Sequence, residues 1–67
     1  MADDLAADTI RRLEDVMASR SLPEHTTELL RVSLGQAKAA KSAGHDQEAI
    51  TIAAQALQIA ETSSTDR

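Results

Sequence analysis

The feature that most constrains this chain is a pair of alanine-rich runs, within residues 36–60, that meet at Ala43-Gly44-His45-Asp46. Glycine commonly supplies the left-handed residue that ends a helix, and aspartate is a favoured N-cap for the helix that follows. Alanines on both runs allow two helix backbones to approach near the low end of the usual range of about 8–10 Å. The pattern therefore predicts a tight helical hairpin with its turn at Gly44.

An amphipathic helix is predicted before this hairpin, because apolar residues recur at helical spacing over residues 5–17. The break that follows contains Pro23, which suits a first helical turn but not a helix interior. Ser21 and Glu24 have the spacing of a capping box, which predicts the start of the second helix.

The fold class that these signals predict is all-α, an antiparallel three-helix bundle with helices at about 3–19, 23–43 and 46–62. Residues 1–62 would form a single domain and residues 63–67 a disordered tail. The predicted buried arcs hold Leu5, Ala6, Ile10, Leu13, Val16 and Met17 on the first helix, and Leu29, Leu30, Val32, Leu34, Ala37, Ala39, Ala40 and Ala43 on the second. Gly35 falls on the polar side of the second helix, where the helix could kink.

The third predicted helix has more apolar surface than one neighbour can cover. One stripe consists of Ile50, Ala53, Ala54, Leu57 and Ala60, and a second of Ile52, Ala56 and Ile59. Together they span about 220°, whereas a helix packed against one neighbour needs about 100°. Two interpretations follow: either both other helices flank this one, or one stripe is an intermolecular interface.

Composition makes association with a partner a fair expectation for a chain this small, and both interpretations of the second stripe stay open. The 67 residues include no aromatic residue and no cysteine, so aromatic core side chains, disulfides and thiolate metal sites are excluded. Small scaffolds without such supports often gain burial by associating. We therefore expect the partner to be another protein or a second copy of the chain, as a homodimer.

The charges divide into three blocks along the chain. Residues 1–28 carry 3 − 7 = −4, residues 29–45 carry +3, and residues 46–67 carry 1 − 4 = −3. A basic middle helix between two acidic helices indicates complementary packing. The alternative is a docking stripe for an acidic partner or nucleic acid, with Arg31 and Lys38 at its centre. Three cations without a stacking aromatic residue make nucleic acid unlikely.

Residues 30–61 resemble a tetratricopeptide-type helical hairpin. The matching positions are Ala37, Gly44, Glu48-Ala49 and Ala56-Leu57. Three-helix modules of the microtubule-interacting-and-trafficking type are similar in their Gly-x-x-x-Glu-Ala pattern. The tetratricopeptide-type resemblance implies a helix–turn–helix unit used for protein binding.

Chemistry-bearing side chains are few. His25 with Glu24 and Glu28 could form a metal edge, and His45 could titrate near neutral pH, but solvated surface positions are favoured for both. No nucleotide, zinc or nucleophile motif occurs. We therefore expect no enzyme, no metal and no cofactor. No apolar run is long enough to cross a membrane, and we expect a cytoplasmic protein.

These observations predict a non-catalytic protein–protein interaction module: a small adaptor, chaperone or regulatory subunit that docks through an apolar helix face. The predicted partner-binding residues are Ile52, Ala56, Ile59, Arg31 and Lys38. The alternative is a nucleic-acid-associated regulator in which the second and third helices form a helix-turn-helix. That alternative requires a basic third helix, and residues 46–65 contain no Lys or Arg.

Overall fold

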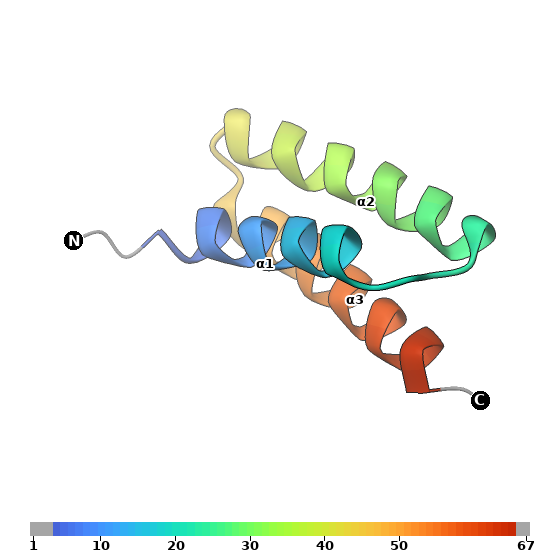
Figure 1. Ribbon diagram of the computed structural model, residues 1–67. Helices are drawn as coiled ribbons and strands as arrows, with labels where there is room; N and C mark the ends of the chain where they lie inside the picture. The colour runs from blue at the N-terminus through green and yellow to red at the C-terminus, as the bar shows by residue number, and fades with distance from the viewer. Residues whose placement is uncertain (1–3, 66–67) are drawn as a thin grey trace.

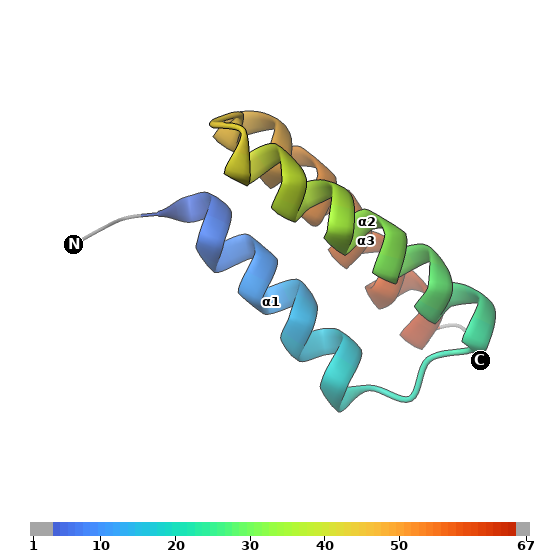
Figure 2. The same ribbon diagram turned by 90° about the horizontal axis from the view of Figure 1, so that it is seen from above.

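The computed structural model describes residues 4–65, with side chains through residue 62, and contains three helices. These are α1 (Leu5–Ser19), α2 (Glu24–Ser42) and α3 (Asp46–Thr65). Helices α1 and α3 run in the same direction, and α2 runs antiparallel to both (Figures 1 and 2). The prediction of an all-α three-helix bundle is confirmed.

The first helix starts at Leu5 because Asp4 caps it. The Asp4 carboxylate accepts a hydrogen bond from the backbone N–H of Ala7 at 3.1 Å, which satisfies one of the donors that a helix start leaves without an internal partner. The helix was predicted to begin near residue 3, which lies outside the described residues. It ends as predicted at Ser19.

The predicted capping box at the start of α2 does not form. Pro23 itself occupies the N-cap position, with a φ of −58° and no side-chain capping bond, and its carbonyl accepts from the N–H of Thr27 at 2.9 Å. Ser21 is therefore two residues too early to cap the helix. The fixed φ of proline already suits this boundary, so the start of α2 does not require a side-chain cap.

The turn between α2 and α3 has the predicted glycine conformation. Gly44 has a φ of 86°, His45 N–H donates to the carbonyl of Ala40 at 2.9 Å, and Gly44 N–H donates to that of Lys41 at 3.0 Å. This pair of bonds is a Schellman motif, which satisfies the last carbonyls of α2. Asp46 is the first residue of α3 rather than its N-cap, because the Ala49 N–H already donates to the carbonyl of His45.

The third helix is longer than predicted. It continues to Thr65, three residues beyond the predicted end at residue 62, and residues 66–67 of the predicted tail lie outside the described part. Residues 61–65 contain neither proline nor glycine, so nothing in the sequence stops the helix. The Thr62 hydroxyl also donates to the carbonyl of Gln58, one turn back.

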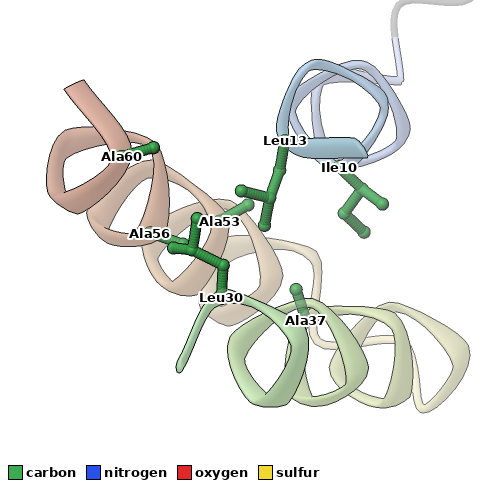
Figure 3. Close-up of a cluster of buried hydrophobic side chains, with 7 residues drawn as sticks. All are labelled: Ile10, Leu13, Leu30, Ala37, Ala53, Ala56 and Ala60. Carbon is green, nitrogen blue, oxygen red and sulfur yellow. The ribbon is translucent and has the colours of Figure 1, made fainter. Parts of the chain in front are cut away.

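Alanines make up most of the buried core. The fully buried apolar residues of α3 are all alanine, namely Ala49, Ala53, Ala56 and Ala60. Within the described residues, the largest fully buried side chains are Leu13 from α1 and Leu30 from α2 (Figure 3). Small side chains on α3 thus create the space into which one leucine from each neighbouring helix packs.

Replacing Gly35 with alanine is expected to stabilise the protein by about 0.8–1 kcal/mol, because alanine is the better helix former in a helix interior. The residue lies within continuous helix, and a Cβ built there meets nothing within 4 Å. The matched control is Gly44→Ala, which places a side chain at a positive φ and is expected to destabilise. Urea denaturation followed by far-ultraviolet circular dichroism measures both. A stability loss for Gly35→Ala would show that α2 needs the glycine.

Candidate functional site

Two ion pairs show which side of α2 faces α1. Lys38 Nζ lies 2.9 Å from Glu14 Oε2, and Lys41 Nζ lies 3.2 Å from Asp4 Oδ2. Both acids belong to the first charge block and both lysines to the second. The prediction that these blocks pack against each other is therefore confirmed at this contact.

Leu29 lies on the opposite side of α2 from these lysines. It precedes Lys38 by nine residues, which is about 180° around a helix at ~100° per residue. Its side chain is 46% exposed. Leu29 therefore points away from α1, next to the core residue Leu30.

Ile59 points away from α1 on the neighbouring helix. Figure 3 shows Ala53 beside Leu13 of α1 and Ala56 beside Leu30 of α2. A step of three residues along a helix changes the direction of the side chain by about 60°. The step from Ala53 to Ala56 turns from α1 toward α2, so the next step, to Ile59, turns beyond the contact with α2. The side chain is 39% exposed.

These placements define one surface of the α2–α3 hairpin, the side opposite α1, which we call the open face. Its members are Leu29, Ser33 and Gln36 from α2 and Ile52, Gln55, Ile59 and Thr62 from α3. None of these side chains carries a formal charge, and the exposed carboxylate of Glu48 lies one turn before Ile52 on the same side of α3. A shallow hollow of about 460 Å³ adjoins Ile59 and is lined by Gln55, Gln58 and Thr62. The open face thus offers aliphatic anchors surrounded by amide and hydroxyl groups.

The structure separates the residues predicted to bind a partner. Ile52 is partly buried against the core, and Ala56 is 1% exposed. Ala56 is therefore internal, and its inclusion as a contact residue is corrected, because α3 faces both other helices and uses its alanines for that contact. Of the second stripe, Ile59 is the most accessible. The internal interpretation of that stripe therefore holds for Ile52 and Ala56, whereas Ile59 keeps accessible apolar surface.

The predicted cationic stripe is also divided. Arg31 is exposed, whereas the Lys38 ammonium group pairs with Glu14 across the α1–α2 contact. A partner that bound Lys38 would have to compete with this ion pair. Lys38 therefore contributes to packing within the bundle.

Three large apolar residues were predicted to be buried and are exposed instead. Leu5 is 63% exposed and Val32 59%, in addition to Leu29. On α2 the polar residue Thr26 takes a core position at 7% exposure. Thr26 lies one turn before Leu30 and therefore on the same side of α2. A helical wheel shows this alignment, but a buried arc chosen by hydrophobicity alone leaves out a threonine.

The histidines do not assemble a metal site in the part of the chain that the structure describes. Residues 4–62 contain no group of three or more His, Cys, Asp or Glu side chains that could hold a metal ion. His25 lines a hollow of about 220 Å³ with Glu28, Leu29 and Val32. His45 lies exposed in the hairpin turn.

Asp4 links the start of α1 to the end of α2. The hydrogen bond from the Ala7 N–H, followed by the bond and charge of the Lys41 ammonium group, holds the pKa of the Asp4 carboxyl below its ordinary value of 3.8. A carboxyl whose pKa is depressed by folding stabilises the folded state above the unfolded pKa. That contribution is lost as the pH falls through the folded pKa.

Acidification is therefore expected to weaken the wild-type protein more than an Asp4→Asn variant. Asparagine keeps a capping oxygen but has no carboxylate to protonate. Urea midpoints measured at about pH 5 and about pH 2, around the pKa of aspartate, give the comparison. Equal acid sensitivity of the two proteins would show that the Asp4 contact contributes nothing to stability.

The fold and the open face together define a small all-α protein in which the α2–α3 hairpin is covered on one side by α1. No helix within residues 4–65 is both long and apolar enough to span a bilayer. A family model matches residues 4–63, and the chain belongs to that family, the PA14_33160 family. No curated protein and no solved structure matches the chain significantly. The tetratricopeptide-like resemblance of residues 30–61 is not confirmed by this match.

Proposed function

We propose that this protein is a non-catalytic protein–protein interaction module that docks through the open face. The observation that carries the proposal is the exposure of Leu29 and Ile59 on the side of the hairpin that α1 leaves uncovered. Because fully burying such a side chain contributes about 1.5–3 kcal/mol, burying the exposed remainder of each contributes roughly 1 kcal/mol.

The chemistry of the open face supports binding rather than catalysis. Its polar members are amides and hydroxyls, which donate and accept hydrogen bonds but do not ionise near neutral pH. A partner helix laid along the face would bury its own apolar stripe against Leu29 and Ile59. An adaptor, chaperone or regulatory subunit in the cytoplasm remains the role that we propose.

The charges of α2 and α3 disfavour the alternative function, a nucleic-acid-associated regulator with a helix-turn-helix. Helix α3 carries Asp46, Glu48 and Glu61 and would present these acids to phosphate groups. On α2, Lys38 and Lys41 are already paired with acids of α1. Arg31 alone makes a weak basis for nucleic-acid binding.

Replacing Ile59 with aspartate is expected to remove the proteins that co-purify with the tagged wild-type chain from its own cells. The loss should be roughly fivefold or more, because replacing an apolar anchor typically costs over about 1 kcal/mol of binding free energy. Leu5→Asp is the matched control, since Leu5 is also exposed but lies on α1. Quantitative mass spectrometry measures the change. Identical protein sets from wild type and Ile59→Asp would refute docking through this face.

A further inference from the structure

We propose that the partner that docks on the open face is a basic amphipathic helix, whose apolar stripe is flanked by lysine or arginine residues. This inference rests on the proposed function, because it names the kind of partner that the same surface binds. It follows from the positions of two glutamates, Glu28 and Glu48, and from the side of α2 on which the cations of the hairpin lie.

Glu48 lies in line with the apolar residues that α3 contributes to the open face. It precedes Ile59 by eleven residues, which is three turns and a difference of only about 20° around the helix. Ile52 lies one turn after Glu48, between the two. Glu48 and Ile59 are both exposed. A partner helix that covers the two isoleucines along α3 therefore also comes up against this carboxylate.

Glu28 has the corresponding position at the other end of the face. It lines the hollow of about 220 Å³ together with Leu29 and Val32, and its side chain is exposed. Glu28 belongs to the first turns of α2, at the end of the hairpin remote from the turn at Gly44, whereas Glu48 follows that turn directly. The two carboxylates thus flank the apolar anchors lengthwise.

The cations of the hairpin lie on another side and do not neutralise these acids. Arg31 and Lys38 follow Leu29 by two and nine residues, about 200° and 180° around α2, so both point away from it. Both lysines of α2 also pair with acids of α1, and α3 contains no Lys or Arg. Within residues 4–62 neither of the two flanking glutamates forms an ion pair. Their countercharge has to come from the partner.

This arrangement selects among the possible occupants. Covering an ionised carboxylate with apolar surface is unfavourable unless a cation or hydrogen-bond donor replaces the lost water. A partner with Lys or Arg beside its apolar stripe supplies that replacement. An acidic segment, a nucleic acid or a second copy that presents this same face brings negative charge to the two glutamates instead, which is repulsive.

The spacing of the two glutamates matches the repeat of a helix. Leu30 lies beside Ala56 (Figure 3), and the two helices are antiparallel, so Glu48, eight residues before Ala56, is level with Lys38, eight residues after Leu30. Glu28 precedes Lys38 by ten residues, which separates the glutamates by about 15 Å along the hairpin. On a partner helix, cations about eleven residues apart lie roughly 16 Å apart and on the same side. One helix can therefore meet both carboxylates while its apolar stripe covers the anchors between them.

Two synthetic peptides that differ only in charge provide the test. Both are helices of about 18 residues with one leucine stripe, and two flanking positions about eleven residues apart are lysine in one peptide and glutamate in the other. Fluorescence anisotropy of the labelled peptides, with protein up to about 1 mM, measures the affinities. The lysine peptide should bind wild type about tenfold more tightly, and about 1 M salt should reduce this preference. Equal affinities, tighter binding of the glutamate peptide, or no binding of either peptide would overturn the inference.

A matched pair of double variants separates the location of the acids from the net charge of −4. Glu28→Gln with Glu48→Gln removes two negative charges from the open face and should abolish the preference for the lysine peptide. Asp8→Asn with Asp15→Asn removes two exposed negative charges from α1 and should leave the preference as in wild type. Circular dichroism confirms that both variants remain folded. An equal loss of preference in both variants would show an effect of net charge alone and would overturn the assignment to this face.

The outcomes distinguish this inference from the function on which it rests. If proteins are lost from the tagged chain on Ile59→Asp substitution but wild type does not prefer the lysine peptide, the basic partner is refuted and the interaction function stands. If the tagged chain recovers only untagged copies of itself through Ile59, the occupant is a second copy and the basic partner is again refuted. If that substitution changes no bound protein and neither peptide binds, both proposals are refuted.

Discussion

Replacing Leu30 with alanine is expected to destabilise the protein by about 2–5 kcal/mol, the usual cost of truncating a fully buried leucine. Leu30 is 0% exposed and packs beside Ala56 (Figure 3). The fully buried α3 residues of this cluster are alanines, which cannot extend into the cavity, while Ile52 and Leu57 of α3 pack at its margin. We therefore expect a cost of about 3 kcal/mol, near the middle of that range.

A loss of this size is large for so small a protein. At about 0.05–0.15 kcal/mol per residue, a chain of 67 residues has a total stability of roughly 3–10 kcal/mol. A loss of about 3 kcal/mol lowers the Tm by roughly 10–25 °C. Thermal denaturation followed by circular dichroism measures the change.

Leu29→Ala is the control for this prediction, because it removes the same atoms from the adjacent residue. Leu29 is 46% exposed, so its truncation should cost about 1 kcal/mol or less in the monomer. Similar losses for both variants would mean that Leu30 is not the main contact of α2 with the core.

Replacing Ala53 with leucine is expected to destabilise the bundle by about 1–3 kcal/mol, even though leucine is the more apolar residue. Ala53 is 0% exposed and lies beside Leu13. Three additional carbon atoms there have no space unless α1 or α2 moves away from α3. Close approach of the helix backbones thus depends on the small side chain.

Ala54→Leu is the matched control, since Ala54 is the next residue on α3 and is exposed. Surface substitutions of this kind usually change stability by less than about 0.5 kcal/mol. Urea denaturation of the two variants compares the same chemical change inside and outside the core. If Ala53→Leu were as stable as wild type, the alanine-lined contact would be loose enough to accept a larger side chain.

The close packing and the open face have a common origin in the alanines of α3. Its contacts with both neighbouring helices use Ala49, Ala53, Ala56 and Ala60, so the larger residue Ile59 is left at the margin of the core. Leu13 and Leu30 fill the centre from the other two helices. The core is therefore filled without Leu29 or Ile59. The side chains of these two residues stay partly exposed, where a partner could contact them.

Local signals accounted for most of the helix boundaries. The positive φ of Gly44 and the end of α1 at Ser19 followed from residue types that act within one turn. The errors at Ser21 and Asp46 were also local, because several residues near each helix start could serve as caps. The extension of α3 to Thr65 reflects helix propagation, which continues where no residue interrupts it.

By itself the sequence determined three helices, a tight hairpin at Gly44, and a basic helix able to pair with an acidic one. Only the tertiary structure decided that α1 covers one side of the hairpin, that Thr26 rather than Leu29 enters the core, and that Ile59 rather than Ala56 is accessible. Helix formation and capping depend on residues within a turn of one another. The choice of buried face instead depends on packing between residues far apart in the chain, such as Leu13 with Ala53 and Leu30 with Ala56, and spacing within one helix does not contain that information.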